Sequence, residues 1–449
     1  MKRREFLAAA GTAVAGAVIA GPVLQKTLVK AGPKKKLALV GTGSRGTGMW
    51  GKDVLRDYGD RVEFVGLCDK NPGRVETGKK IIGAACPTFT DFDQMLDETS
   101  PDALIVTTVD ATHDEFIVKG LARGLEVITE KPMTTDERKC QAIFDAERKA
   151  EKPIVVTFNY RYSPHRQKIK ELLQKHRIGQ VVSVDFNWYL DVYHGADYFR
   201  RWHGQRDKSG TLLVHKATHH FDLLNWWIDS DPFEVFAYGA LEFYGSNHEF
   251  RSKKCRGCEF KSKCKFFWDI TKDRDAARLT ALYVNNEKHD GYLRDRCVWN
   301  EDVDIFDKMA VQIKYANNVQ VSYSLTTYSP YEGYRIVFNG TDGRLEAWIH
   351  ERQPWPMDKF DEIRVTDSFG KTELIRIPQG TGGHGGGDVR MKDRIFKNPG
   401  ADDPLELAAG SRDGAMSCLV GIAARKSIDT GKPVRITSLT DLVPTPDRT

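Results

Sequence analysis

Short apolar runs alternate with amphipathic segments through the first third of the chain. Four of these runs have the length and composition of buried strands, at residues 37–40, 62–68, 103–107 and 126–129. Segments with helical periodicity lie between them, for example at 116–123. This β-α alternation predicts a doubly wound parallel sheet, whose ligand binds at the carboxyl ends of the strands.

The pattern changes near residue 181 to alternating apolar and polar positions that are rich in Val, Tyr and Phe. The alternating segments span residues 181–188, 235–241, 309–315, 319–325, 335–339 and 345–348. They predict an α+β domain with a large, mostly antiparallel open sheet that helices cover on one face. Because 449 residues are too many for one ordinary domain, we expect a first domain at 34–155 and a second at 156–449.

The distribution of charge excludes one class of function. The formal net charge is +5, but residues 1–33 hold five Lys or Arg and one Glu, which supply +4 of it. The remainder is close to neutral, whereas a protein that binds nucleic acid needs a clustered basic face. We therefore expect no nucleic-acid partner.

The N-terminus has the pattern of an export signal. The pair Arg3-Arg4 precedes an uncharged run, rich in Ala and Gly, that continues to Gln25. A twin-arginine pair before a weakly apolar segment is typical of a Tat signal, and the run is poorly hydrophobic for a membrane span. We expect residues 1–33 to be signal and linker, cleaved or kept as a tether, and the protein to be periplasmic or otherwise exported.

A glycine-rich motif follows the first predicted strand: Gly41-Thr42-Gly43-Ser44-Arg45-Gly46. In a G-x-G-x-x-G motif the first glycine permits a tight turn, the second admits a pyrophosphate, and the third packs helix against strand. Asp69 ends the second strand, where a carboxylate binds the ribose hydroxyls of NAD and repels a 2′-phosphate. The pattern predicts a Rossmann domain that binds NAD, while Lys70 leaves NADP open.

Three further segments give the chain a specific resemblance. They are His113 in a loop after a strand, Glu130-Lys131-Pro132, and Asn159-Tyr160-Arg161-Tyr162-Ser163-Pro164. Together with the glycine motif they resemble the Gfo/Idh/MocA family of NAD(P)-dependent oxidoreductases. The resemblance implies that Lys131 lies beside the nicotinamide ribose and the reacting hydroxyl, and that Pro132 follows a cis peptide bond. It also places His113, Glu130 and Arg161 at the cofactor, and implies a sugar or polyol substrate and homo-oligomers formed through the open sheet.

Two histidines carry the catalytic expectation for the second domain. Many members of this family have Asp and then His four residues later, which handle the proton of the substrate hydroxyl. His219 matches that histidine and Asp222 a following structural acid, but His215 stands at the Asp position. Imidazoles at i and i+4 share a helix face, so one could act as a general base, or both could bind a metal.

A histidine also lies inside a glycine run, Gly382-Gly383-His384-Gly385-Gly386-Gly387. Glycines give mobility and close backbone approach, as a loop that folds over a ligand requires. The run resembles glycoside hydrolase family 109, the NAD-dependent glycosidases, in which a loop histidine protonates the leaving group; His384 matches it. A surface loop without function is the alternative, and Glu130-Lys131-Pro132 has the oxidoreductase form.

Four cysteines are concentrated in an insertion at about 250–300: Cys255, Cys258, Cys264 and Cys297. Four thiols at such spacing can bind a structural zinc. Export to an oxidising compartment favours two disulfides instead, and an iron–sulfur cluster is the third possibility.

These features predict an exported oxidoreductase with tightly bound NAD or NADP. Because a periplasm has no pool of this cofactor, the reduced cofactor must be re-oxidised on the same enzyme, in a redox-neutral cycle. Lys131, His215 and His219 would surround the reacting carbon. The alternatives are an NAD-dependent glycosidase that oxidises carbon 3 transiently and uses His384, and a non-catalytic periplasmic sugar-binding protein.

Overall fold

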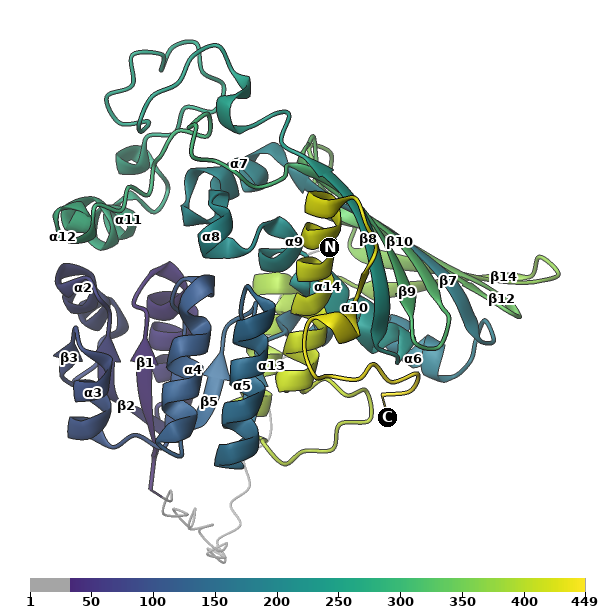
Figure 1. Ribbon diagram of the computed structural model, residues 1–449, viewed down its shortest axis with the longest axis horizontal. Coiled ribbons are helices and arrows are strands. Elements are labelled where there is room, and N and C mark those ends of the chain that lie inside the picture. Colours follow the sequence, from purple (N-terminus) through teal and green to yellow (C-terminus); the bar gives the residue numbers. More distant parts are fainter. Residues whose placement is uncertain (1–32, 449) are drawn as a thin grey trace, which may run out of the picture.

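Six parallel strands form the first sheet of a computed structural model that describes residues 33–448 (Figure 1). The strand order is β3-β2-β1-β4-β5-β6, as in a doubly wound sheet. The strands are β1 Lys35–Val40, β2 Val62–Cys68, β3 Thr88–Phe89, β4 Ala103–Val106, β5 Glu126–Thr129 and β6 Ile154–Val156. The prediction of a parallel, nucleotide-binding type of sheet is confirmed. The predicted export signal lies outside the described residues.

Strand register brings the chemistry-bearing segments of the first domain to one edge. Val40 pairs with both Cys68 and Val106, and Val106 pairs with Thr129. The glycine motif, Asp69, the loop after β4 and Glu130-Lys131 each follow one of these strand ends. Because the four strands end level with one another, these segments meet along one side of the sheet.

Helices cover both faces of this sheet. They are α1 Asp53–Tyr58, α2 Pro72–Ile82, α3 Phe92–Thr99, α4 His113–Ala122 and α5 Glu137–Ala150. The glycine motif leads first into a π-helical turn, Gly46–Lys52, which α1 continues. Asn71, Asp91 and Asp136 cap α2, α3 and α5 through their side chains.

Nine strands form the second sheet, in the order β14-β13-β12-β11-β7-β10-β9-β8-β15. Neighbours are antiparallel except β7 and β10. The strands are β7 Val181–Asp191, β8 Pro232–Ala240, β9 Lys308–Tyr315, β10 Gln320–Ser329, β11 Glu332–Gly340, β12 Gly343–Arg352, β13 Phe360–Asp367, β14 Thr372–Pro378 and β15 Val434–Arg435. The predicted large open sheet is therefore confirmed.

Helices of the second domain pack between this sheet and the first domain. They are α6 Pro164–Gln174, α7 Val192–Arg200, α8 Arg206–Ser209, α9 Leu212–His215, α10 Thr218–Ile228, α13 Gly387–Phe396 and α14 Ser411–Thr430. Helix α14 contacts α5 and β6 of the first domain as well as α9, α10 and β8 of the second, and Figure 1 shows it between them. Within residues 33–448, no helix is long and apolar enough to cross a membrane.

The insertion between β8 and β9 reaches back to the first domain. It contains the short helices α11 Ala276–Leu282 and α12 Glu287–Asp290. Helix α11 contacts α2, and Figure 1 shows α11 and α12 beside α2 at the edge of the first sheet. Sequence reasoning predicted an insertion at this place but not this contact.

Candidate active site

A cleft of about 1620 Å³ opens where the strand ends of the first sheet face the second domain. It is lined by Gly41, Gly43, Ser44, Arg45 and Asp69 from the first domain, and by Tyr160, His203, His215, His219 and His384 from the second. The insertion closes one side of it. Most of the residues predicted to form the site are thus brought together.

The glycine motif has the close packing that its sequence predicts. A Cβ on Gly41 would lie 2.6 Å from the Thr107 carbonyl, and one on Gly46 would lie 2.1 Å from the Gly41 carbonyl oxygen. Gly43 and Ser44 line the cleft, and the Ser44 N–H points out of the loop. Such an amide beside a bare glycine is what a pyrophosphate oxygen needs, so the loop fits a dinucleotide.

Asp69 is held by the protein itself. Its Oδ2 accepts hydrogen bonds from the Thr42 N–H (2.8 Å) and the Thr42 hydroxyl (3.1 Å), and its Oδ1 pairs with Arg74 (3.2 Å). Thr42 is fully buried, so its contribution is to fix Asp69 rather than to line the cleft. Asp69 still borders the cleft, where the ribose end of a dinucleotide is expected.

Lys131 is a half-buried residue just after the end of β5, and the predicted cis peptide bond joins it to Pro132. Its Nζ donates to the backbone carbonyl of His215 at 3.0 Å. Burial lowers the pKa of Lys131 to about 8, although the nearby Asp110 and Glu130 act to raise it. The amine is therefore close to the pKa that suits proton transfer near neutral pH.

His215 forms a buried pair with Asp110, at 2.5 Å between Nδ1 and Oδ2. A carboxylate oxygen accepts from Nδ1–H, which leaves Nε2 as the proton acceptor of the ring. Burial raises the pKa of Asp110 and lowers that of His215, well away from their usual values. The family pattern places a carboxylate at position 215; in this chain His215 stands there, and its ring bonds a carboxylate from the segment after β4, that of Asp110.

His219 lies on a different helix from His215, so the prediction of one shared helix face is wrong. The backbone N–H of Ala217 donates to the carbonyl of Leu212, five residues earlier, and that of His219 donates to Lys216, three residues earlier. The regular four-residue spacing of an α-helix is therefore interrupted between α9 and α10. His219 stacks on Tyr160, with ring centroids 4.1 Å apart, and its buried Nδ1 has no partner among the described residues. Both histidines nevertheless line the same cleft.

The glycine loop that carries His384 is tied to the site by hydrogen bonds. His384 Nδ1 lies 3.0 Å from Asn159 Nδ2 and 3.0 Å from Asp388 Oδ1, and its ring is 6.5 Å from that of His219. Burial acts to raise the pKa of Asp388, but His384, Arg45 and Asn159 lower it below its usual value. Arg45 pairs with Glu130 as well (2.7 Å), so it joins this loop to the glycine motif.

Comparison with known proteins decides the family. Residues 35–158 match the description "Oxidoreductase family, NAD-binding Rossmann fold", and residues 170–436 match "Oxidoreductase family, C-terminal alpha/beta domain". The chain belongs to the Gfo/Idh/MocA oxidoreductase family. It is therefore an oxidoreductase with an NAD-binding domain. The alternative of a non-catalytic sugar-binding protein is set aside.

Individual relatives in this family differ in how much of the chain they match. A putative oxidoreductase, YteT of Bacillus subtilis (strain 168), is 38% identical over 425 residues, which are 90% of this chain and 98% of YteT. Inositol 2-dehydrogenase of Salmonella typhimurium is 25% identical over 197 residues, 43% of this chain and 56% of that enzyme. The structure of levoglucosan dehydrogenase with NADH and levoglucosan superposes with a TM-score of 0.63 at 17% identity, covering 90% and 100% of the two chains, which shows a shared fold.

Three residues that the Gfo/Idh/MocA resemblance places at the cofactor have internal partners. His113 lines the cleft but bonds the Pro132 carbonyl at 2.8 Å, and Glu130 accepts from Trp50 and Arg45. Arg161 does not line the cleft. It forms a buried ion pair with Asp222 (2.6 Å) and a second with Asp413 (2.8 Å), so its prediction as a cofactor ligand is corrected to a structural role.

Several cleft residues were missed by sequence reasoning. Lys216 donates to the Tyr160 hydroxyl at 2.9 Å, and Trp202 stacks on His203 with centroids 3.6 Å apart. These side chains and Tyr198 build an aromatic wall next to the Asp110–His215 pair. The Tyr160 position was visible only as part of the family motif, and Asp110 carried no signal beyond following a strand.

The four cysteines of the insertion are all free thiols. In the described part of the chain, no three His, Cys, Asp or Glu side chains are arranged to hold a metal ion. Arg200 Nη1 donates a hydrogen bond to Cys255 Sγ at 2.9 Å, so this sulfur already has a cationic partner. The structure supports neither the predicted zinc nor a two-histidine metal site, and the alternative of two disulfides is not formed.

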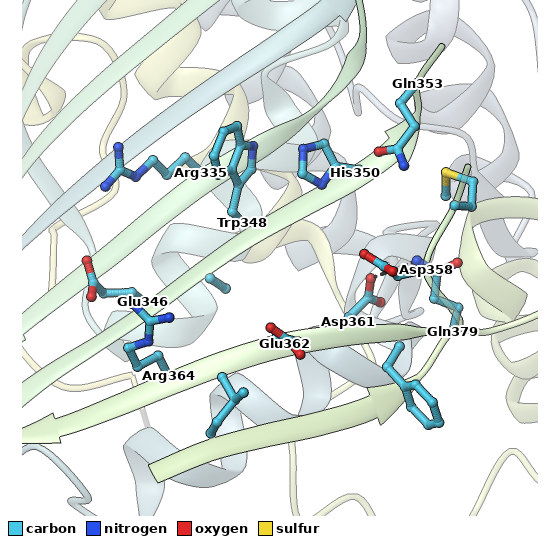
Figure 2. Close-up of a pocket in the computed structure, with 14 residues that line it drawn as sticks. Arg335, Glu346, Trp348, His350, Gln353, Asp358, Asp361, Glu362, Arg364 and Gln379 are labelled. Atoms are coloured by element: carbon cyan, nitrogen blue, oxygen red, sulfur yellow. Dashed lines mark hydrogen bonds between the residues drawn. The ribbon is translucent and has the colours of Figure 1, made fainter. Parts of the chain in front are cut away.

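A second, smaller hollow of about 380 Å³ lies on the open face of the second sheet. Figure 2 shows its charged and aromatic side chains on β11, β12 and β13, among them Arg335, Trp348 and Glu362. Trp348 is 53% exposed there. None of the predicted catalytic residues lines this hollow, so the chemistry belongs to the larger cleft.

Proposed function

We propose that the protein oxidises a hydroxyl of a sugar or polyol, with Lys131 taking the hydroxyl proton. Bound NAD would supply the hydride acceptor for the carbon that bears this hydroxyl. The observation that carries the proposal is the half-buried Lys131, with a pKa of about 8, which bonds the His215 carbonyl in the cleft that the glycine motif and Asp110 also line.

The side chains around Lys131 have complementary tasks. The His215 carbonyl orients the Lys131 amine, and Asp110 fixes the His215 ring so that Nε2 can hold the substrate hydroxyl. His219 is buried and its pKa is lowered first by burial and then by Lys131, so it stays neutral and can accept a second hydroxyl proton in a hydrogen bond.

The cleft wall supports a ring-shaped, polyhydroxylated substrate. Stacked aromatic and imidazole rings (Trp202 on His203, His219 on Tyr160) offer flat apolar surfaces, and Lys216 offers a donor beside them. Sugar rings present apolar C–H faces and polar edges, which such walls match. The names of two relatives, levoglucosan dehydrogenase and inositol 2-dehydrogenase, agree with this class.

The cycle is redox-neutral in this proposal, because the twin-arginine pattern favours export with NAD already bound. One substrate molecule would give its hydroxyl proton to Lys131 and its hydride to the bound cofactor. A second carbonyl compound would then take both, which returns Lys131 to the neutral amine. NADP in place of NAD would require Lys70 or Arg74 to bind a 2′-phosphate beside Asp69.

A homo-oligomer formed through the open sheet is part of the proposal. The hollow on β11 to β14 exposes Trp348, Phe360 and Leu374 by 53%, 45% and 44%. Exposed aromatic side chains gathered on one face are typical of interfaces. Light scattering of Trp348→Glu should give a smaller particle than wild type, and an unchanged mass would argue against this face.

A glycosidase is the second candidate, favoured by one observation. His384 faces the cleft, fixed by Asn159 and Asp388, and its ring lies 6.5 Å from that of His219. There it could protonate the departing oxygen of a glycoside after oxidation at carbon 3 acidifies the hydrogen on carbon 2. Water would then add to carbon 1, and the stored hydride would return to carbon 3.

The experiment that tests the proposed function starts from protein purified without unfolding. Acid release should give about one NAD per chain, and a panel of sugars and polyols should reduce the bound NAD in wild type but not in Lys131→Met. Tyr238→Phe, on the exposed face of β8, is the control and should behave as wild type. Reduction by Lys131→Met at the wild-type rate would contradict the proposal.

A further inference from the structure

The insertion contacts the dinucleotide-binding loop through one hydroxyl group. The Ser44 N–H donates to the Tyr283 hydroxyl at 2.8 Å, and that hydroxyl lies 3.0 Å from Ser44 Oγ. A Cβ on Gly43 would lie 3.4 Å from the same oxygen. The Tyr283 hydroxyl therefore stands over the part of the loop where the glycine motif admits a pyrophosphate.

Two further contacts fasten the insertion to the adenosine side of the cleft. Arg74, which also pairs with Asp69, donates to Asp290 Oδ2 at 2.7 Å. Asn71 Nδ2 donates to the Asn286 carbonyl at 3.0 Å. Both partners lie at or just before the start of α2, directly after the β2 end where the ribose of a dinucleotide is expected.

The segment that makes these contacts has a small apolar core of its own. Ile270, Leu279, Leu282 and Tyr283 are buried together, and Ile81 of α2 packs against them. The Arg74 guanidinium lies over the rings of Tyr283 and Tyr292, at 5.8 and 6.0 Å from their centroids. The segment is thus an ordered element docked on the first domain rather than a loose loop.

We propose that residues 276–294 form a clasp that retains the cofactor, with the Tyr283 hydroxyl as a ligand of its pyrophosphate. With the dinucleotide in place, the Ser44 N–H and the Tyr283 hydroxyl would both be available to donate to its pyrophosphate. Because the clasp docks on α2 beside the expected ribose site, the cofactor would leave only after the clasp has moved away from α2. The inference rests on the proposed function in one respect, since a redox-neutral cycle requires a cofactor that stays bound between half-reactions.

The test measures cofactor release directly and needs no substrate. Holoprotein is diluted into an excess of a nucleotide-trapping dehydrogenase, and the rate at which NAD appears is compared between variants. Tyr283→Phe should release NAD roughly ten- to one-hundred-fold faster, because a hydrogen bond to a charged phosphate is lost. Tyr238→Phe removes a hydroxyl from an exposed tyrosine on β8 and should release NAD at the wild-type rate.

A second variant opens the clasp without replacing the side chain that is proposed to contact the phosphate. A Cβ on Gly73 would lie 1.9 Å from Asn286 Oδ1, so Gly73→Ala should push the clasp away from α2 and also accelerate release. Hydrogen–deuterium exchange should show residues 276–294 better protected in wild-type holoprotein than after NAD is removed, and this measurement does not depend on any variant folding.

The outcomes separate the clasp from the proposed function. If wild type binds NAD but Tyr283→Phe releases it at the same rate, the clasp is wrong and the oxidoreductase proposal stands. If Tyr283→Phe binds NAD more tightly, the hydroxyl competes with the phosphate, which also overturns the clasp. If wild type neither retains nor binds NAD or NADP, the proposed function fails and the clasp with it.

Discussion

Replacing Lys131 should change the dependence of the oxidation rate on pH as well as the rate itself. With a pKa of about 8, roughly one-tenth of the amine is neutral at pH 7 and half at pH 8. Since only the neutral amine can take the hydroxyl proton, the oxidation rate should rise about tenfold per pH unit below 8 and level off above it. The Lys131→Met variant should be about 10²–10⁴ slower, and its rate should no longer rise with pH in this range.

Removing the charge of Asp110 gives a second test of the role of Lys131, because it should shift the pKa of Lys131 in a known direction. The Asp110 charge acts to raise the pKa of Lys131, so removing that charge in Asp110→Asn should lower it. The pH at which the oxidation rate levels off should therefore fall, by roughly one unit or more. The assay is single-turnover reduction of bound NAD from pH 6 to 10. The role of Lys131 as proton acceptor would be refuted if the rate of Lys131→Met still rose with pH as in wild type. It would also be refuted if the rate of Asp110→Asn levelled off at a higher pH than in wild type.

Three other variants separate structural from catalytic roles. Arg161→Met leaves Asp222 buried without its cation, whereas Asp413 keeps Arg448, so thermal unfolding should show a loss of about 3–5 kcal/mol, while refolded protein keeps its NAD affinity. Cys258→Ser should leave the Tm unchanged, and metal analysis should find no stoichiometric zinc; one zinc per wild-type chain would contradict the free thiols. His384→Ala should retain NAD and, if glycosides are cleaved, should cut cleavage by about 10²–10⁴; cleavage in heavy water without deuterium at carbon 2 would exclude that route.

The first domain could be predicted closely because its signals are local. Each strand is a short apolar run, and each functional segment directly follows a strand end, as the glycine motif follows β1 and Glu130-Lys131 follows β5. In a parallel sheet that sequence position fixes the spatial position as well. The cleft at these strand ends followed from the same argument.

The parts that sequence did not predict depend on contacts between distant segments. Strands β13 and β14 alternate, but charged residues interrupt their apolar positions, so the sheet is wider than expected. Asp110 meets His215 from 105 positions away, and nothing near either residue indicates the other. The break between α9 and α10 separates His215 from His219 although their spacing fits one helix.

The contacts of the insertion between β8 and β9 could not be predicted from the sequence for the same reason. The cysteine spacing of residues 255–297 indicated a metal or disulfides, whereas the structure shows free thiols and an arginine at Cys255. The contact of Tyr283 with Ser44 joins residues 239 positions apart, and the sequence around Tyr283 has no motif that indicates it. Such roles depend on where the insertion docks, and local pattern does not determine that.

Isotope transfer tests the central claim most directly. Native protein is mixed with sugars and polyols that carry deuterium on each hydroxyl-bearing carbon, and after the first half-reaction the nucleotide is released with alkali, in which its reduced form is stable, and analysed by mass spectrometry. If Lys131 serves hydride transfer as proposed, at least one of these compounds should place one deuterium on the bound NAD in wild type, and none should do so in Lys131→Met. A nucleotide that stays unlabelled with every sugar and polyol, or that is labelled equally in Lys131→Met, would contradict this proposal.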